Sequence, residues 1–214
     1  MYLKIQSTRL GIYVSLIGVV ATAGLASPQI SQPPGTAAIT KNPLSARAAM
    51  INVLGVPNPN PALGDEAQTV DRLVGTWDAD FTFPKPDGTV FRKKGELHFG
   101  WVLDGYALQD LWIGYPTGTQ QTRTIGTTLW FFDTTLKQWR VVFINPQSGD
   151  VVTMQGARDG DRIVLRGVDT AGLPTRWTFR DITPGSFRWQ GEKSHDGGRT
   201  WTLEEDNQMR KRAG

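Results

Sequence analysis

The stretch Gly75-Thr76-Trp77-Asp78-Ala79-Asp80-Phe81-Thr82-Phe83 decides the fold of this 214-residue chain. From Trp77 onward, apolar and polar residues alternate with a period of two, so one face of the segment is buried and the other is wet. The Gly-x-Trp at its head opens a series of about ten aromatic-rich, turn-punctuated segments that runs to the C-terminus. This pattern predicts an all-β fold, a single antiparallel up-and-down β-barrel whose first strand places Trp77 across one end.

The segment before this strand predicts a short N-terminal helix over Leu63–Val74. Its apolar residues recur at helical spacing, and Asp65 and Glu66 lie in the first turn, where the helix dipole favours acidic groups. Gly75 ends the helix, which we expect to cover one end of the barrel. We assign residues 62–214, which hold all eight Trp and all nine Phe residues, to one barrel domain.

A hairpin is predicted at Asp104-Gly105, which fits a two-residue type I′ turn with positive φ at both positions. The turn fixes a register, because residues on one face of paired strands lie directly opposite one another. The expected pairs are Leu103 with Tyr106, Trp101 with Leu108, Phe99 with Asp110, and Leu97 with Trp112. Asp110 is therefore a carboxylate on the most aromatic face of this hairpin.

Two further hairpins are predicted, one around the loop Thr134–Lys137 and one at the turn Asp159-Gly160. In the first, the expected pairs are Asp133 with Gln138, Phe132 with Trp139, Trp130 with Val141, and Thr128 with Phe143. In the second, we expect Met154 and Val152 beside Leu165 and Gly167, with Ile163 opposite Gly156. The pairs of the first of these hairpins form a second aromatic face.

Residues 1–26 have the pattern of a signal peptide. Lys4 and Arg9 form a positively charged region, Leu10–Val20 forms an apolar region, and small residues suited to cleavage follow. The apolar run is short of the ~20 residues that a spanning helix needs. We expect cleavage and export, to the periplasm or the extracellular medium, with no stable membrane anchor afterwards; an uncleaved N-terminal anchor is the alternative.

The next segment, residues 27–61, is predicted to be a flexible, Pro-rich tether. It holds seven of the 13 prolines and no Trp, Phe or Tyr, so it cannot bury enough apolar surface to offset the entropy of ordering. Three alanines allow a short helical turn around Leu44–Leu54. We expect the rest to be disordered or loosely packed on the barrel.

Composition narrows the range of partners. The full chain has 23 basic and 20 acidic residues, and removal of Lys4 and Arg9 with the signal leaves 21 against 20. A nearly neutral chain gives no electrostatic reason to expect nucleic acid or an anionic membrane as a partner, and we expect a monomer. The chain has no Cys, which excludes disulfides and a cysteine-linked lipid anchor.

Four short motifs occur in order: Gly75-Thr76-Trp77, Trp101-Val102-Leu103-Asp104-Gly105, Gly126-Thr127-Thr128-Leu129 and the closing Trp201…Arg210. In these motifs the sequence resembles a bacterial family of mostly exported, lipocalin-like barrels, catalogued as domain of unknown function 1579, over residues 63–212. The resemblance implies a calycin-like barrel with a cavity and no particular reaction. In lipocalins a basic residue of the last strand packs on the Trp of Gly-x-Trp, which implies that Arg210 or Arg212 packs on Trp77.

The segment from Ser194 to Trp201 matches the Asp-box of sialidase-type propellers, Ser-x-Asp-x-Gly-x-Thr-Trp. Because it occurs only once, we interpret it as a staple of the last hairpin. His195 lies in that turn, and His98 is expected on the outer face of its strand. A similar barrel group, the nitrobindin-like haem proteins, uses a His as the iron ligand. No His is predicted on the aromatic face here, so we expect no haem, metal or other cofactor.

Among the acidic residues, Asp110 is distinguished by its predicted aromatic neighbours. A buried carboxylate needs a partner or a raised pKa, and Arg176 or Arg180 is a candidate cross-barrel partner. The other reading is an Asp bonded to the backbone or to a neighbouring strand. The run Glu204-Glu205-Asp206 is expected on the wet face and edge of the last strand.

The favoured hypothesis is an exported, lipocalin-like protein that binds a small hydrophobic or amphipathic molecule in the barrel. Aromatic side chains would form the wall and Asp110, with Arg176, a polar anchor. The expected site residues are Trp101, Tyr106, Asp110, Trp112, Trp130, Phe132, Val141, Phe143 and Arg176. The alternatives are a barrel enzyme of the isomerase or hydrolase type and a filled-barrel scaffold that binds partners. No catalytic residue is assigned.

Overall fold

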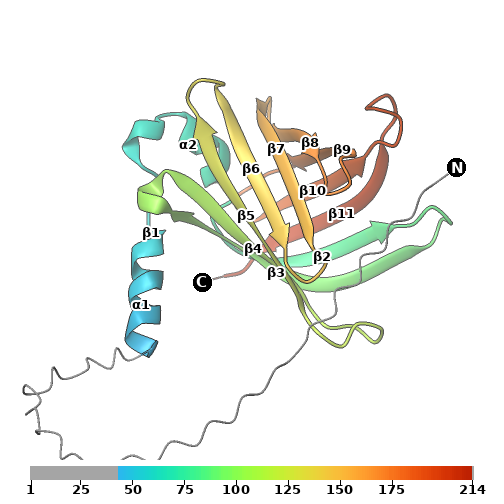
Figure 1. The fold of residues 1–214 in the computed structure, drawn as a ribbon, viewed down its shortest axis with the longest axis horizontal. Helices are drawn as coiled ribbons and strands as arrows, with labels where there is room; N and C mark the ends of the chain where they lie inside the picture. Colours follow the sequence, from blue (N-terminus) through green and yellow to red (C-terminus); the bar gives the residue numbers. More distant parts are fainter. Residues whose placement is uncertain (1–42, 214) are drawn as a thin grey trace, which may run out of the picture. The chain divides into compact units, whose positions relative to one another are not determined.

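Ten antiparallel strands, β2 to β11, close into a barrel in the computed structural model, which describes residues 43–213 (Figure 1). Each strand pairs with the next along the chain, and β11 pairs back with β2. A barrel closed in this way has no free sheet edge. The predicted fold, an up-and-down barrel with a short helix before its first strand, is confirmed.

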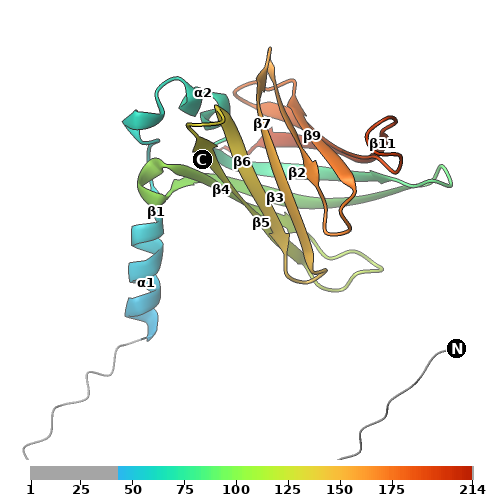
Figure 2. The same ribbon diagram turned by 45° about the horizontal axis from the view of Figure 1, so that its top comes forward.

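The strands of the barrel have the following bounds: β2 Gly75–Pro84, β3 Val90–Val102, β4 Ala107–Gly114, β5 Thr124–Asp133, β6 Gln138–Asn145, β7 Asp150–Asp159, β8 Arg162–Val168, β9 Pro174–Arg180, β10 Ser186–Lys193 and β11 Thr202–Lys211. Outside the barrel are α1 Pro43–Leu54, β1 Gly55–Val56, the 3₁₀ turns η1 Pro61–Leu63 and η2 Leu103–Gly105, and α2 Glu66–Asp71. Both views show the strands tilted and wrapped around a common interior (Figures 1 and 2).

The registers predicted for two hairpins agree with the strand pairing. Between β3 and β4, Trp101 pairs with Leu108, Phe99 with Asp110, and Leu97 with Trp112. Between β5 and β6, all four expected pairs are present, from Asp133 with Gln138 to Thr128 with Phe143. Alternation and turn chemistry are sufficient here because a slip of one residue would turn every aromatic side chain outward.

The tip of the β3–β4 hairpin differs from the expected ladder. Asp104 and Gly105 both have positive φ, and the amide of Tyr106 donates to the carbonyl of Leu103 at 3.1 Å, as in a type I′ turn. However, Leu103 also has positive φ (53°), and the ladder stops one pair earlier. The Leu103 and Tyr106 side chains are therefore 52% and 51% exposed instead of lying on the aromatic face.

The register predicted for the β7–β8 hairpin is wrong. Asp159 pairs with Arg162, so the two turn residues are Gly160 and Asp161. Only Gly160 has positive φ, which is the arrangement of a type II′ turn with Gly at the first central position. The shift by two residues keeps the same faces but places Met154 opposite Gly167 and Leu165 opposite Gly156.

The helix expected over Leu63–Val74 is shorter in the structure. It consists of η1 and the six-residue α2, and α2 turns Ala67, Thr69 and Val70 inward. Asn60 caps η1, because its side chain accepts a hydrogen bond from the Ala62 amide at 3.0 Å. Leu73 is fully buried directly after α2, so the apolar repeat continues to face the core beyond the end of the helix.

Part of the segment expected to be a free tether is attached to the barrel. Residues 1–26 and 27–42 lie outside the described residues, whereas 43–61 form α1, β1 and a connection to η1. β1 pairs with the end of β3, and the Asn60 amide donates to the Gly105 carbonyl at 3.0 Å. Close approach is possible because residue 105 has no side chain; a β-carbon there would lie 2.7 Å from the Asn58 carbonyl oxygen.

Helix α1 projects from the barrel at β1 (Figures 1 and 2). Its apolar residues Met50, Ile51 and Val53 are 61–76% exposed. Among the described residues, no helix has both the length and the apolar character needed to cross a membrane.

Trp77 joins α2 to the barrel. Its side chain is fully buried, its indole N–H donates to the Leu73 carbonyl at 2.7 Å, and its ring lies edge-on to Phe187 at 4.7 Å. The basic residue over the ring is Lys211, 5.1 Å from its centroid, and not Arg210 or Arg212 as the resemblance implied. Lys211 is the register partner of Trp77, which places it over the ring, whereas its two neighbours point to Asp80 and Asp78.

Candidate ligand-binding cavity

The two ends of the barrel carry different structures. Because the strands run alternately in opposite directions, their connections alternate between the ends. One end holds α2, η2 and the turns 134–137, 160–161 and 181–185, and Arg72 donates across it to the Asp161 carbonyl at 2.9 Å. The other end holds the connections 85–89, 115–123, 146–149, 169–173 and 194–201. The first end is covered by α2.

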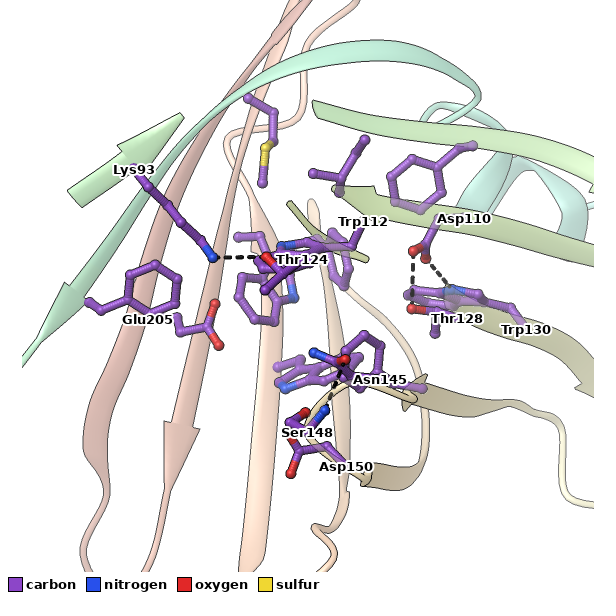
Figure 3. A pocket seen from close by; sticks show the side chains of 18 of the residues that line it. Lys93, Asp110, Trp112, Thr124, Thr128, Trp130, Asn145, Ser148, Asp150 and Glu205 are labelled. Carbon is purple, nitrogen blue, oxygen red and sulfur yellow. Dashed lines mark hydrogen bonds between the residues drawn. The ribbon is translucent and has the colours of Figure 1, made fainter. Parts of the chain in front are cut away.

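A cavity of about 320 Å³ occupies the interior toward the second end (Figure 3). Its apolar wall is formed by Phe83, Leu97, Phe99, Trp112, Trp130, Phe143, Trp177, Phe179, Trp189 and Met209. Polar groups also line it: Lys93, Asp110, Gln120, Thr124, Thr128, Asn145, Ser148, Asp150 and Glu205. An apolar pocket with a few convergent polar groups is the usual form of a small-molecule site.

Asp110 is the most deeply buried charged group of the cavity. Only 4% of the residue is exposed, and its carboxylate accepts hydrogen bonds from Thr128 Oγ1 at 3.1 Å and Trp130 Nε1 at 3.2 Å. Burial raises its pKa to about 7, and these hydrogen bonds counteract part of that rise. An indole N–H only donates, so Oδ2 accepts in either protonation state and the proton, when present, is on Oδ1.

Glu205 on β11 is a second interior carboxyl group. Burial raises its pKa to about 7. Its Oε2 accepts from Asn207 Nδ2 at 3.1 Å, and Asn207 is fully buried with its Oδ1 accepting from the Thr82 amide at 3.0 Å. The backbone amide thus fixes the orientation of the Asn207 side chain, and that side chain fixes one oxygen of Glu205.

The placement of Glu205 corrects the expectation that the run from Glu204 to Asp206 lies on the wet face. Met209, Asn207 and Glu205 alternate inward along β11, while Asp206 pairs outside with Arg188. A bulge then leaves Glu204 unpaired, because Glu205 faces Gly191 and the next residue of the ladder is Leu203. Because three consecutive residues are acidic, the sequence of this segment does not show the alternation of inward and outward positions.

Lys93 on β3 contributes the cation of the cavity. Its Nζ donates to Thr124 Oγ1 at 3.0 Å and lies 4.8 Å from the Trp112 ring centroid (Figure 3). Burial lowers its pKa, and the charge of Glu205 opposes this shift. Within residues 43–213, Lys93 forms no salt bridge.

Of the predicted site residues, the structure brings Asp110, Trp112, Trp130 and Phe143 together around the cavity. Trp101, Phe132 and Val141 belong to the packed core and do not line the cavity. Trp101 donates to Asp71 at 2.8 Å, and Phe132 packs edge-on to Trp139 at 5.7 Å. Tyr106 is exposed on the β3–β4 turn. Alternation identifies the inner face of a strand but not the depth along the barrel.

The candidate pair between Asp110 and Arg176 is not formed, and Asp110 is bonded to the neighbouring strand β5, as the other interpretation predicted. Arg176 points outward, because it precedes the inward Trp177 by one residue, and it binds Glu192 through two hydrogen bonds of 2.7 and 2.8 Å. Its guanidinium lies 4.5 Å from the ring centroid of Trp201. Arg180 likewise pairs elsewhere, with Asp181 at 3.2 Å.

The Asp-box forms a hydrogen-bonded turn after β10. Asp196 accepts from the amides of Arg199 and Thr200 at 2.9 and 2.8 Å, and its pKa is lowered to about 2, chiefly by the Thr200 hydroxyl. His195 is exposed in this turn. His98 lies on the outer face of β3, 3.2 Å from Thr76 Oγ1.

Replacing Asp196 by alanine is expected to expose the Arg199 and Thr200 amides to solvent exchange while changing global stability little. The substitution removes their common acceptor from a surface turn. In the wild type this protection persists above the unfolded-state pKa near 4 and is lost as the pH falls toward 2. Hydrogen exchange measured by mass spectrometry checks it, with His195→Ala as control; equal exchange in both variants would contradict the staple.

No family model matches the chain. No curated protein matches it either. Among the solved structures that share its fold are two of low sequence identity. The crystal structure of Rv2717c from M. tuberculosis is 15% identical with a TM-score of 0.54, covering 73% of this chain and 100% of that one. The S-type phycobiliprotein lyase CPES from Guillardia theta is 8% identical with a TM-score of 0.51, covering 69% of this chain and 92% of that one. Identities this low establish a similar fold alone.

Proposed function

We propose that this protein binds a small hydrophobic or amphipathic molecule inside the barrel. The observation that carries the proposal is the cavity of about 320 Å³, whose aromatic wall surrounds a few fixed polar groups. Its volume is at the lower end of the range for ligand pockets, about 300–1,000 Å³, which favours a compact molecule over a long chain. The fold shared with the phycobiliprotein lyase is calycin-like and is compatible with small-ligand binding.

A hollow interior removes the main support for the filled-barrel scaffold. Small barrels often use bulky side chains to fill their interior, and here that filling is complete only toward the end covered by α2. The Trp77, Trp101 and Trp139 side chains, which do not line the cavity, are each at most 2% exposed, whereas Trp112 and Trp177 face the cavity and are half-buried. The space that remains is bordered by polar loops.

An acid–base enzyme is the second candidate. Asp110, Glu205 and Lys93 all line the cavity, and burial moves the pKa of each toward neutrality. Groups that titrate near pH 7 in a cleft are suited to proton transfer. Turnover of a bound molecule that is lost in both Asp110→Asn and Glu205→Gln, while binding persists, would favour catalysis over binding alone.

Export, cleavage after residue 26 and a monomeric state belong to the same proposal. Export and cleavage are supported by the n-region, h-region and cleavage pattern of the first 26 residues. Membership of the family of domain of unknown function 1579 is proposed on the four short motifs. Native mass spectrometry of the protein recovered from cell fractions gives the cleavage site, the oligomeric state and any bound molecule together.

Binding is expected to change the tryptophan emission, because four Trp side chains line the cavity. At a ligand concentration of 100 Kd, the melting temperature should rise by about 5–10 °C. The test is a titration with compact neutral and charged aromatic probes, followed by fluorescence and thermal denaturation. Trp112→Phe should reduce the emission change, and Trp201→Phe, outside the cavity, should not. Absence of any response across the probes would overturn the proposal.

A further inference from the structure

Several hydrogen-bond donors that line the cavity have no partner within the described part of the chain. A protonated lysine has three N–H donors, and Lys93 uses one of them on Thr124. The indole N–H groups of Trp112, Trp177 and Trp189, whose rings line the cavity, make no hydrogen bond within the described part of the chain. By contrast, both oxygens of Asp110 already take part in hydrogen bonds, to Thr128 and Trp130.

The backbone of β4 makes room for the Lys93 amine. A β-carbon at Gly114 would lie 2.7 Å from both Cε and Nζ of Lys93 and 2.5 Å from Thr124 Oγ1. These distances are shorter than any real contact of a β-carbon, so a side chain at position 114 would displace the ammonium group. The absence of a side chain at Gly114 therefore leaves room for Lys93 to bind Thr124 at the cavity wall, and Figure 3 shows this hydrogen bond.

Glu205 does not neutralise Lys93. It forms no ion pair with Lys93 within 4 Å among residues 43–213, and its Oε2 is held by Asn207. Its proton, when present, is on Oε1, for which the described residues provide no hydrogen-bond partner. A protonated Glu205 and an ammonium group thus present donors on the same side of the cavity, as Figure 3 shows for their side chains.

We propose that the cavity is a site for a compact aromatic carboxylate, with its carboxylate on Lys93 and its ring among the tryptophans. This inference rests on the proposed binding function and names its ligand class. A charge-assisted hydrogen bond from Lys93 supplies the anchor, and the apolar wall holds the ring. A protonated Glu205 donates a second hydrogen bond to the same anion.

Proton uptake should accompany this binding. A bound anion favours the protonated form of Glu205, so the affinity for a carboxylate falls as the pH rises above 7. The other charged groups near Glu205 are Glu204 and Lys193, which pair with each other at 3.1 Å, and Lys193 also pairs with Asp169 at 3.0 Å. Two further carboxyl groups line the cavity, Asp110 on β4 and Asp150 at the start of β7. An amine ligand would show the opposite dependence on pH.

The experiment compares three probes of one shape by isothermal titration calorimetry at pH 6 and pH 8: 2-naphthoate, 2-naphthamide and 2-naphthylmethylamine. At pH 6 the wild type should bind 2-naphthoate about tenfold or more tightly than 2-naphthamide. Only the naphthoate affinity should fall at pH 8. Titrations in buffers of different ionisation enthalpy should show net proton uptake for the naphthoate alone.

Two variants test whether the preference for 2-naphthoate over 2-naphthamide depends on the Lys93 side chain. Lys93→Met should remove the preference for naphthoate over naphthamide, and Gly114→Ala should reduce it although the lysine remains. Lys94→Met is the control, because its exposed neighbouring side chain pairs with Asp80 outside the barrel. If naphthylmethylamine binds best, or if Lys93→Met leaves the preference unchanged, the carboxylate assignment is wrong while binding stands. If none of the probes binds at either pH, the carboxylate assignment falls together with the support for a ligand cavity.

Discussion

Replacing Trp77 by alanine is expected to lower the free energy of unfolding by about 4–6 kcal/mol. Removal of a large aromatic side chain from a core costs about 3–5 kcal/mol, and Trp77 is fully buried against Phe187. The Leu73 carbonyl also loses its indole donor, which adds about 1 kcal/mol or more. Because domains are stable by only about 5–15 kcal/mol, the variant is expected to be close to unfolding.

Urea denaturation followed by far-UV circular dichroism measures this loss, with Trp77→Phe as the matched control. Phenylalanine keeps a ring against Phe187 and under Lys211 but has no N–H for the Leu73 carbonyl. We expect Trp77→Phe to cost about 1–3 kcal/mol, clearly less than the alanine variant. A loss below 2 kcal/mol for Trp77→Ala would show that α2 and the barrel end are held by other contacts.

The sequence was sufficient to predict the register of a hairpin where its turn residues allow only one turn geometry. Asp104-Gly105 requires positive φ at both residues, and both have it. Asp159-Gly160-Asp161 is different, because one glycine fits either the second position of a type I′ turn or the first of a type II′ turn. The pairing of β7 with β8 selects the second option. The local sequence could not select between the two registers, because both place the same residues on the inner face.

The alternation of inward and outward positions along the strands also places two ionisable residues inside the barrel, but their charged neighbours obscured them. Counting inward positions back from Leu97 reaches Lys93, and counting back from Met209 reaches Glu205. The charged neighbours of these residues made both segments resemble a solvated face. For Glu205, the bulge at Glu204 also hides where the alternation ends, and a bulge has no fixed sequence signature.

Position along the barrel axis is the information that the sequence does not contain. Trp101 and Phe132 lie on the inner face, as expected, yet they pack around Trp139 outside the cavity. The depth of each side chain depends on strand tilt and on where α2 sits, which are properties of the closed barrel. The local sequence therefore determines which face of the strand a residue is on. Whether that residue lines the cavity depends on the geometry of the whole barrel.

Replacing Asp110 by asparagine is expected to stabilise the protein above neutral pH, and the gain should grow from about zero near pH 4 to about 2–4 kcal/mol at pH 8. Burial raises the pKa of Asp110 to about 7, above its unfolded value of 3.8. Between these values the folded state binds more protons than the unfolded state, so wild-type stability falls as the pH rises. Asparagine has no proton to lose and keeps both hydrogen bonds, with Oδ1 accepting from Trp130 and Nδ2 donating to Thr128.

Chemical denaturation at several pH values from 4 to 8 tests this prediction in both proteins. Each buried carboxyl group contributes a slope on the order of 1.4 kcal/mol per pH unit between its two pKa values. The wild type has two such groups, so Asp110→Asn should remove part of the slope and Glu205→Gln should remove a further part. A gain in Asp110→Asn that is equal at pH 5 and pH 8 would mean that Asp110 is ionised in the folded protein throughout. Its two neutral donors would then be enough to hold a buried charge, and the acid–base candidate would lose its proton donor on β4.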